Sequence, residues 1–580
     1  MEQRNRIFTP QRMKQLILAT SCAMALAPLA ANAQNSDPLA RYQWHLHNTG
    51  QKVPADTLPV SGVDLNVDSA YKAGIHGKGV TIAIVDDGLQ IKHPDLKANI
   101  ATTVAGKNFA DQSNDPTPSN LTNDSHGTMV AGIAGAVGNN NLGVRGVAPA
   151  ATLKGFNPIS RTAKGDQTLN IEYSWWDGNE VKDVDVFNNS FGSGPRNGSL
   201  PLSISENQIS SYEKGMTSTR KGLGGIYVKS AGNSFNTAHD GTNDYCTKDT
   251  ITRGNGCIPA TRDTRNNFIN TITIGAVRAD GVRSSYSSTG SSLWVSAFGG
   301  EQGLENSYLP GYQKEYYDPG IVTTDPTDCL QGHNRDATVY NSMDGASSSI
   351  DKTCNYTARM NGTSAAAPMV SGVAALILET NPTLSYREVK YILATTADQT
   401  DKSHSSWVKN KAGRYYSNWY GFGVVDAAKA VEAADSFNTP LPALVDTGWK
   451  NTPKSVPIGN ASGPAIISID LSSAPSKIET VQIGFELSHQ DTRRLQFVLI
   501  SPSGTRSVVQ PAYTAIGSGL TWFGTPDQVN FSKWDLIASN AFLDETGKGK
   551  WQLEVSDLGL GKGARSVGSL TSFKIRVLGH

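Results

Sequence analysis

This 580-residue sequence has no net charge and few long apolar runs. It has 51 Lys and Arg against 51 Asp and Glu, so the whole molecule has no attraction to nucleic acid or an anionic membrane. One apolar run, at 16–31, follows four basic residues and leads to a small-x-small site, which predicts a secretory signal over 1–33. The alternative is a membrane anchor, but the run is short and contains Pro28. No later run reaches the roughly 20 residues of a membrane span.

Cysteine is also scarce, with five in the chain. Cys22 lies inside the predicted signal, and the residues before it match a lipoprotein box poorly, which disfavours lipidation. Four cysteines remain, and an even number in an exported protein predicts two disulfides. Three pairings are open, of which Cys246–Cys257 with Cys329–Cys354 is favoured because it closes the shortest loops. Their irregular spacing matches no zinc pattern.

Short β-branched segments alternate with helical stretches from residue 79 to about 434. The segments at 80–85, 184–187, 225–228 and 269–274 have the composition of buried parallel strands. Helices are expected at 126–137 and 363–380. This alternation predicts a doubly wound, mostly parallel α/β domain, which we place at residues 34–437.

The composition changes after residue 437. Residues 438–459 are rich in Pro, Gly, Ser and Asn and are predicted to form a linker. Residues 460–580 have no helical period but contain alternating or apolar runs separated by turn residues, at 466–471, 478–485, 495–500, 551–555 and 573–577. We therefore expect an all-β sandwich there. Its Trp522, Trp534 and Trp551 would suit a binding surface, although tryptophans in such strands belong more often to the core.

Four polar residues stand at the ends of predicted strands or the starts of predicted helices. Asp86 follows the strand at 80–85, His126 and Ser364 begin helices, and Asn233 comes after a further strand. Open α/β sheets bind ligands at the carboxyl ends of their strands. A serine nucleophile needs an imidazole to take its proton and a carboxylate to orient that imidazole, and an amide N–H can stabilise the oxyanion. Together the four residues predict this chemistry.

The motifs at 80–96, 126–132 and 361–368 resemble those of subtilisin-like serine proteases. Residues 499–506 and 551–555 resemble the P domain that follows the catalytic domain in the kexin/furin-like branch. The resemblance covers about residues 37–435 and 460–580. It implies a secreted or periplasmic serine endopeptidase that acts on peptides or proteins and binds no nucleic acid.

The resemblance also implies residue roles. Asp86 would orient the histidine, His126 would act as general base and then acid, Ser364 as nucleophile and Asn233 as oxyanion donor. A calcium site is implied in which Asp37, Asp95 and Asn140 give side-chain oxygens. The implied calcium ligands are Asp37, Asp95, Val137, Asn140, Leu142 and Val144.

Kexin-like enzymes cut after basic residues, and the resemblance assigns substrate-binding acids accordingly. Asp87 would face the P2 side chain, Asp124 would supply a second acid nearby, and Asp263 would lie at the bottom of the pocket for P1, the residue before the cut. Two departures from the family pattern, after Ser190 and around Ser288, remove acids expected at a second calcium, for which Asp240 is a remaining candidate ligand. The prediction is a preference for Lys or Arg, including dibasic sites, and the alternative is a broad-specificity extracellular subtilase.

Two further expectations follow. Subtilases usually carry a pro-region of some 80 residues, whereas the catalytic motifs here begin at Asp37, so we expect a separate exported chaperone to assist folding. The competing class of function is a binding protein, in which the β-sandwich recognises a ligand and the α/β portion is an inactive scaffold. A full set of triad residues disfavours it.

Overall fold

The computed structural model describes residues 37–193, 200–237, 246, 250, 252–309, 311, 316–460, 463–520, 526–559 and 567–580. The predicted signal at 1–33, Cys22, Asp240 and Trp522 lie outside the described residues. Contacts group Ser36–His580 into one compact unit.

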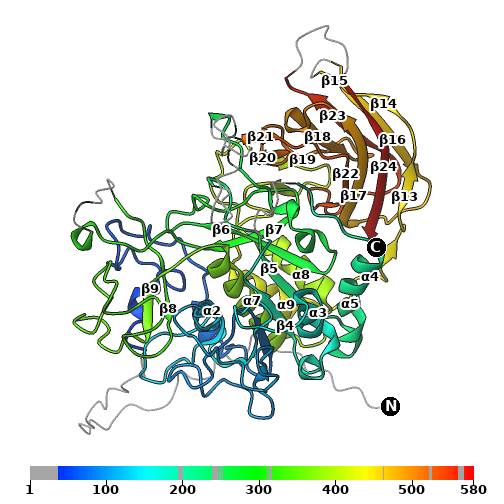
Figure 1. The fold of residues 1–580 in the computed structure, drawn as a ribbon. Helices are drawn as coiled ribbons and strands as arrows, with labels where there is room; N and C mark the ends of the chain where they lie inside the picture. Colours follow the sequence, from blue (N-terminus) through cyan, green and yellow to red (C-terminus); the bar gives the residue numbers. More distant parts are fainter. Residues whose placement is uncertain are drawn as a thin grey trace, which may run out of the picture. The chain divides into compact units, whose positions relative to one another are not determined.

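Seven parallel strands form the central sheet, in the order β2-β3-β1-β4-β5-β6-β7. Figure 1 labels β4, β5, β6 and β7 of this sheet. The order reverses around β1, because β3 pairs with one side of it and β4 with the other, which places a ligand crevice at its carboxyl end. The predicted doubly wound parallel sheet is confirmed. The strands are β1 (Thr81–Val85), β2 (Gly106–Lys107), β3 (Thr152–Phe156), β4 (Val186–Asn189), β5 (Ile226–Ser230), β6 (Thr271–Val277) and β7 (Leu293–Phe298).

Helices cover this sheet and connect its strands. The α-helices of the described residues are α1 (Asp68–Lys72), α2 (His126–Gly135), α3 (Gln167–Glu172), α4 (Glu206–Glu213), α5 (Gly215–Ser218), α7 (Thr363–Thr380), α8 (Tyr386–Thr396) and α9 (Ala427–Ser436). Short turns of other helix types are η2 (Ala40–Tyr42), η3 (Tyr173–Asp177), η4 (Asn179–Val181), η5 (Arg220–Gly222), η6 (Ala260–Arg262), η7 (Thr264–Asn267), η8 (Asn306–Tyr308) and η9 (Thr492–Arg494). Helix α2 ends two residues earlier than predicted, because Ala136 turns to an extended ψ of 144°.

Both faces of the sheet are buried. Successive strand residues point to opposite faces, and in β1 Ile82 and Ile84 join one hydrophobic cluster whereas Ala83 and Val85 join another. Helices α2 and α7 contribute to the first cluster, and α3 and α4 to the second. Near-continuous apolar strands are the sequence signature of this arrangement.

A disulfide-closed hairpin is attached to α2. Strands β8 (Ile321–Thr324) and β9 (Tyr356–Met360) pair antiparallel. The hydroxyls of Thr323 and Thr324 donate to carbonyls of α2 at 2.8 and 2.7 Å. Cys329–Cys354 closes the loop between these strands, and Cys246–Cys257 is the other bridge, so the favoured pairing is confirmed.

The C-terminal portion consists of two mainly antiparallel sheets (Figure 1), which confirms the predicted all-β fold. One sheet is built on β12-β24-β17-β22 with β13 and β14 beside β24, and the other on β15-β23-β18-β19 with β16 beside β23. Residues 445–457, within the predicted linker, pair with β24. The strands are β12 (Val445–Asp446), β13 (Lys450–Thr452), β14 (Val456–Pro457), β15 (Gly459–Asn460), β16 (Ala465–Leu471), β17 (Ile478–His489), β18 (Leu495–Ile500), β19 (Arg506–Gln510), β20 (Ser518–Leu520), β21 (Pro526–Gln528), β22 (Lys533–Ser539), β23 (Gly549–Asp557) and β24 (Gly568–Gly579). Two further pairs are β20 with β21 and β10 (Trp407–Lys409) with β11 (Tyr415–Ser417).

Tryptophan burial bears on the alternative of a binding surface on the sandwich. Trp534 and Trp551 are 1% and 0% exposed and belong to the core between the sheets, so neither contributes to such a surface. In the described part of the chain, α7 alone has the length and hydropathy to cross a membrane, and 89% of that stretch is buried inside the protein.

Candidate active site

Asp86 and His126 are joined at the carboxyl end of β1. Asp86 directly follows the strand and is fully buried. Its Oδ1 lies 2.8 Å from Nδ1 of His126 and also accepts from the backbone N–H of Asp87. The His126 side chain is 33% exposed, so the other ring nitrogen can meet a substrate. A buried carboxylate that holds one nitrogen of a partly exposed imidazole is the orienting half of a catalytic triad.

Asp87 fixes the start of the helix that carries the histidine. Its two carboxylate oxygens accept from the backbone N–H groups of His126 and Gly127 at 3.0 and 2.7 Å. These are otherwise unpaired donors at a helix N-terminus. A Cβ on Gly127 would lie 2.0 Å from the Gly88 carbonyl oxygen, so only glycine allows the helix to approach β1 this closely. The acid predicted to face P2 therefore also caps α2.

Electrostatics around the histidine favour its charged form. Burial lowers the pKa of His126, but the charge and hydrogen bond of Asp86, together with the charge of Asp87, outweigh burial and raise it to about 9. Burial and repulsion from Asp86 raise the pKa of Asp87 to about 7. Asp86 is therefore placed to stabilise the imidazolium that forms when the histidine takes a proton.

Ser364 begins the long core helix α7 and exchanges hydrogen bonds with Ser190. The Ser364 hydroxyl donates to the Ser190 carbonyl at 3.0 Å, and the Ser190 hydroxyl donates to the Ser364 carbonyl at 2.9 Å. The second bond satisfies the Ser364 carbonyl, which would otherwise accept a helical hydrogen bond from residue 368. Residue 368 is a proline and has no N–H to donate. Pro368 stands in the second turn of α7.

Asn233 lies beside the nucleophile segment. Its side-chain oxygen accepts from the backbone N–H and the hydroxyl of Thr363, both at 2.9 Å. These bonds leave Nδ2, which makes no hydrogen bond with the described residues, and a Cβ on Gly362 would lie 3.0 Å from it. An amide N–H held next to the nucleophile is the arrangement that an oxyanion donor needs.

One pair of the four predicted catalytic residues is hydrogen-bonded, and the other two are adjacent through Thr363. Asp86 holds His126, and Asn233 holds Thr363 next to Ser364. Helices α2 and α7 pack together, but among the described residues no hydrogen bond joins the Ser364 hydroxyl to the imidazole. Such a bond often forms only when substrate is bound.

The six predicted calcium ligands form one hydrogen-bonded network. Asp37 accepts from the N–H groups of Asn139 and Asn140 at 3.0 and 3.1 Å. Asp95 accepts from Asn140 Nδ2 at 2.7 Å and from the Val144 N–H at 2.9 Å. The Val137 N–H donates to the Asp95 carbonyl, and the Leu142 N–H donates to the side chain of Asn140.

The charges in this network fit a cation. Asp37 and Asp95 are 3% and 0% exposed, and Arg145, 2.8 Å from Asp37, is the ion-pair partner of this carboxylate. Burial raises the pKa of Asp95 to about 6, and the charge of Asp37 adds to this rise. Two buried carboxylates and an amide next to a loop supply the hard oxygen ligands that calcium prefers, so these residues fit the predicted ion.

The other two predicted substrate-binding acids bond to the protein itself. Asp124 accepts from the Ser160 hydroxyl at 2.8 Å and is 3% exposed. Asp263 is 8% exposed and pairs with Lys229 and Arg265. The sequence pattern does not indicate that Arg265 pairs with Asp263 or that Ser190 contacts the nucleophile. For Lys229 a signal exists, because a lysine inside a buried strand requires a partner.

The β-sandwich contacts the loop that carries Asp263. Asn267, four residues later, donates to the carbonyls of Thr261 and Asp263. It also accepts, through its carbonyl and side-chain oxygens, from Gln482 of β17 and from the N–H of Ala538 of β22, at 2.8 and 2.9 Å. Strands of the sandwich therefore hold the conformation of this loop.

Comparisons with known proteins agree with this fold. The sequence profile of the Subtilase family matches residues 77–423, and that of the proprotein convertase P-domain matches residues 478–577. The chain belongs to the Subtilase family and is a serine endopeptidase with a C-terminal P domain. The predicted resemblance to the kexin/furin-like branch is confirmed.

Particular relatives cover nearly the whole chain. The Aeromonas extracellular serine protease of Aeromonas sobria is 34% identical, over 94% of this chain and 91% of that protein. Human proprotein convertase subtilisin/kexin type 6 is 28% identical, over 90% of this chain and 46% of that protein. The crystal structure of the Aeromonas sobria serine protease aligns with a TM-score of 0.81 at 32% identity, over 94% of this chain and 96% of that one. The complex of that protease with the chaperone ORF2 aligns with a TM-score of 0.82 at 32% identity, over 94% of this chain and 95% of the matched chain.

Proposed function

We propose that this protein is a secreted serine endopeptidase that uses Asp86, His126 and Ser364 as its triad and Asn233 as an oxyanion donor. The observation that carries the proposal is the 2.8 Å contact between buried Asp86 and partly exposed His126. His126 takes the proton of the Ser364 hydroxyl as that oxygen attacks the scissile carbonyl, and then returns it to the leaving amine. Nδ2 of Asn233 donates to the oxyanion of the tetrahedral intermediate.

A direct assay tests this function. The purified protein is expected to hydrolyse an internally quenched peptide, and stoichiometric fluorophosphonate is expected to stop the reaction, because the reagent reacts with an activated serine. Hydrolysis that persists after complete phosphonylation would contradict a serine mechanism.

The proposed substrate preference is for Lys or Arg before the cut. Asp87, Asp124 and Asp263 support it by residue type, but the protein's own donors already bond all three carboxylates. This specific observation favours the second candidate, broad specificity. We therefore propose a modest preference for basic residues.

We also propose that calcium binds Asp37, Asp95 and Asn140 and joins the N-terminal segment to the loop at 137–144. An ion that binds only the folded state stabilises it by about 2.7 kcal/mol at a hundred times Kd. Because the entropy of unfolding grows with chain length, removal of calcium with a chelator is expected to lower Tm by about 2 to 3 °C, as measured by differential scanning calorimetry.

The control for calcium uses matched substitutions. Asp37→Asn should remove most of the chelator effect, because a ligand charge is lost, whereas Asp435→Asn, at an exposed site on α9, should leave it intact. An equal chelator effect in the protein and in Asp37→Asn would place the ion elsewhere.

A separate chaperone is the partner we propose, and export by the signal at 1–33 is the proposed route to the folding compartment. Support comes from the relative that was solved in complex with a chaperone. Expression without a separate chaperone of this kind is expected to lower the yield of fluorophosphonate-reactive protein by at least about tenfold. Equal yields of reactive protein with and without it would contradict the proposal.

A further inference from the structure

The Asp263 carboxylate lies beside the segment that contacts the nucleophile. Its Oδ2 accepts from the Ser193 N–H at 3.0 Å, and three residues earlier the Ser190 carbonyl accepts from the nucleophile hydroxyl. Asn266, in the same loop, donates to the carbonyl of Ala231, two residues before the oxyanion donor. The loop with Asp263 therefore joins the two segments that flank the reacting serine.

Two internal cations share this carboxylate. Lys229 is fully buried, with Nζ 3.3 Å from Asp263 Oδ2 and 2.6 Å from the Phe191 carbonyl oxygen that accepts from it. Arg265 donates to Asp263 three times, from its backbone N–H and Nε at 3.1 Å each and from Nη2 at 3.2 Å. The group holds two positive charges and one negative charge.

The pKa shifts of Asp263 and Lys229 bear on the charges that these side chains carry. Burial alone would raise the pKa of Asp263, but Arg265 and Lys229 outweigh burial and hold it well below its ordinary range. Burial lowers the pKa of Lys229 to about 8. At neutral pH the Asp263 carboxylate is ionised, and Lys229 and Arg265 already neutralise its negative charge.

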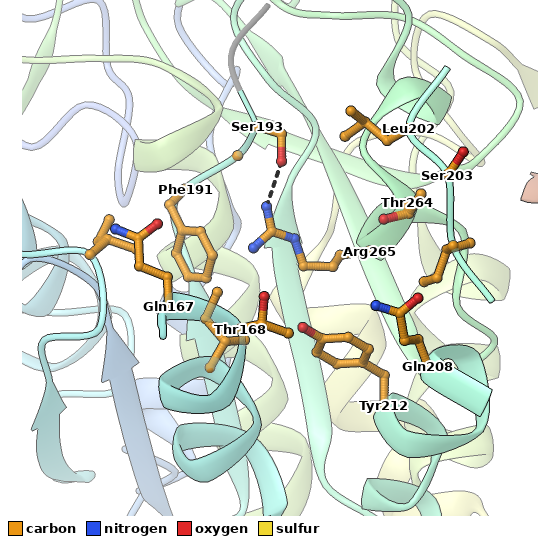
Figure 2. A pocket seen from close by; sticks show the side chains of 14 residues that line it. Gln167, Thr168, Phe191, Ser193, Leu202, Ser203, Gln208, Tyr212, Thr264 and Arg265 are labelled. Carbon is orange, nitrogen blue, oxygen red and sulfur yellow. Dashed lines mark hydrogen bonds between the residues drawn. The ribbon is translucent and has the colours of Figure 1, made fainter. Parts of the chain in front are cut away.

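Arg265 is the one of the two cations that reaches a surface cavity. Lys229 is enclosed, whereas the Arg265 side chain is 13% exposed and lines a cavity of about 350 Å³ with Phe191 and Ser193. Figure 2 shows its guanidinium directed at Ser193, whose hydroxyl accepts from Nη2 at 2.9 Å. A substrate side chain that approaches the Asp263 carboxylate from this cavity would therefore contact Arg265.

We propose that Arg265 is a specificity-determining residue that occupies the Asp263 carboxylate in place of a substrate cation, so that the enzyme accepts neutral as well as basic P1 side chains. This inference rests on the proposed function and on the family resemblance, which implies that Asp263 lies at the bottom of the P1 pocket. A substrate lysine or arginine must share one carboxylate with two cations, and like charges at such short range repel. Without Arg265, Asp263 keeps Lys229 and the Ser193 N–H, so the acid stays partnered while one competitor is lost.

The test compares peptides that differ only at P1, with arginine, its neutral isostere citrulline, or phenylalanine there. For the unmodified protein, kcat/KM for arginine is expected to exceed that for citrulline by less than about tenfold. Arg265→Gln is expected to raise this ratio by about tenfold, mainly through a lower KM for arginine.

Matched variants isolate the charge. Arg265→Lys keeps a cation and should leave the ratio near that of the unmodified protein, and Arg41→Gln, at an exposed position, controls for the overall loss of one positive charge. In Asp263→Asn the further substitution of Arg265 should have no effect on the ratio, because the two residues act through one contact.

The outcomes are separable. The role of Arg265 is overturned if the arginine-to-citrulline ratio of kcat/KM in Arg265→Gln is no higher than in Arg41→Gln. It is also overturned if Arg265→Gln raises this ratio equally when Asp263 has been replaced by asparagine. If Arg265→Gln yields no fluorophosphonate-reactive protein, the unmodified protein decides alone, and an arginine preference above about tenfold over citrulline overturns the proposal. Failure of the unmodified protein to hydrolyse any peptide or to react with fluorophosphonate instead refutes the proposed function.

Discussion

Replacement of Ser364 by alanine is expected to lower kcat by about a million-fold, the loss that removal of the nucleophile causes in subtilisin. The hydroxyl at the start of α7 is the only group in the proposed mechanism that forms a covalent bond with the substrate carbonyl. The remaining Asp86 and His126 would have no nucleophile to activate. Steady-state hydrolysis of a quenched peptide, at enzyme concentrations high enough to detect a residual rate, measures the effect.

The same variant should remain folded. Ser364 loses one buried hydrogen bond to Ser190, which costs about 1 kcal/mol, a small part of the stability of a chain of this size. The matched Ser436→Ala, at an exposed position of α9, should keep full activity. Residual hydrolysis within a hundredfold of the unmodified protein, with contaminating proteases excluded by active-site titration, would remove Ser364 from the mechanism.

Replacement of Asp86 by asparagine is expected to lower kcat by about ten thousand-fold. The amide keeps the shape of the carboxylate but cannot stabilise the imidazolium, and it favours the wrong tautomer of His126. Because Asp86 raises the pKa of His126, its charge also sets the pH dependence. The protein needs a neutral imidazole as base, so kcat/KM should increase with pH as His126 loses its proton.

In Asp86→Asn the rising part of this pH profile should move to lower pH. The opposing effect of burial then acts on the imidazole with less compensation, so its pKa falls. Asp435→Asn, on the exposed side of α9, serves as the matched control and should show the original profile. A ten thousand-fold loss without a shift in the profile would mean that Asp86 has a structural role and does not set the charge of His126.

The sequence predicted the elements whose local signals agree with the fold. Five of the strands in the sandwich and four in the parallel sheet were placed within a few residues, because apolar β-branched runs between turn residues have few other stable arrangements. The disulfide pairing also followed from loop length alone. The helix of Ser364 was placed correctly because small and apolar residues continue over Thr363–Thr380.

Other features depend on contacts between distant residues. Nothing in the sequence around Arg265 indicates that it pairs with Asp263 and Ser193, since the last lies 72 positions earlier. The exchange of hydrogen bonds between Ser190 and Ser364 joins residues 174 positions apart. The predicted acids had the right residue type, but whether a carboxylate faces substrate or an internal donor is decided by tertiary packing, which one sequence does not contain.

Identification of the residue that reacts with a fluorophosphonate tests the central proposal most directly. The protein is labelled at one equivalent, digested, and the modified peptide is sequenced by mass spectrometry. The proposed mechanism predicts a single label on Ser364, which disappears when Asp86 or His126 is replaced. A label on Ser190 or on any other serine, or no label on protein that still hydrolyses peptides, would contradict it.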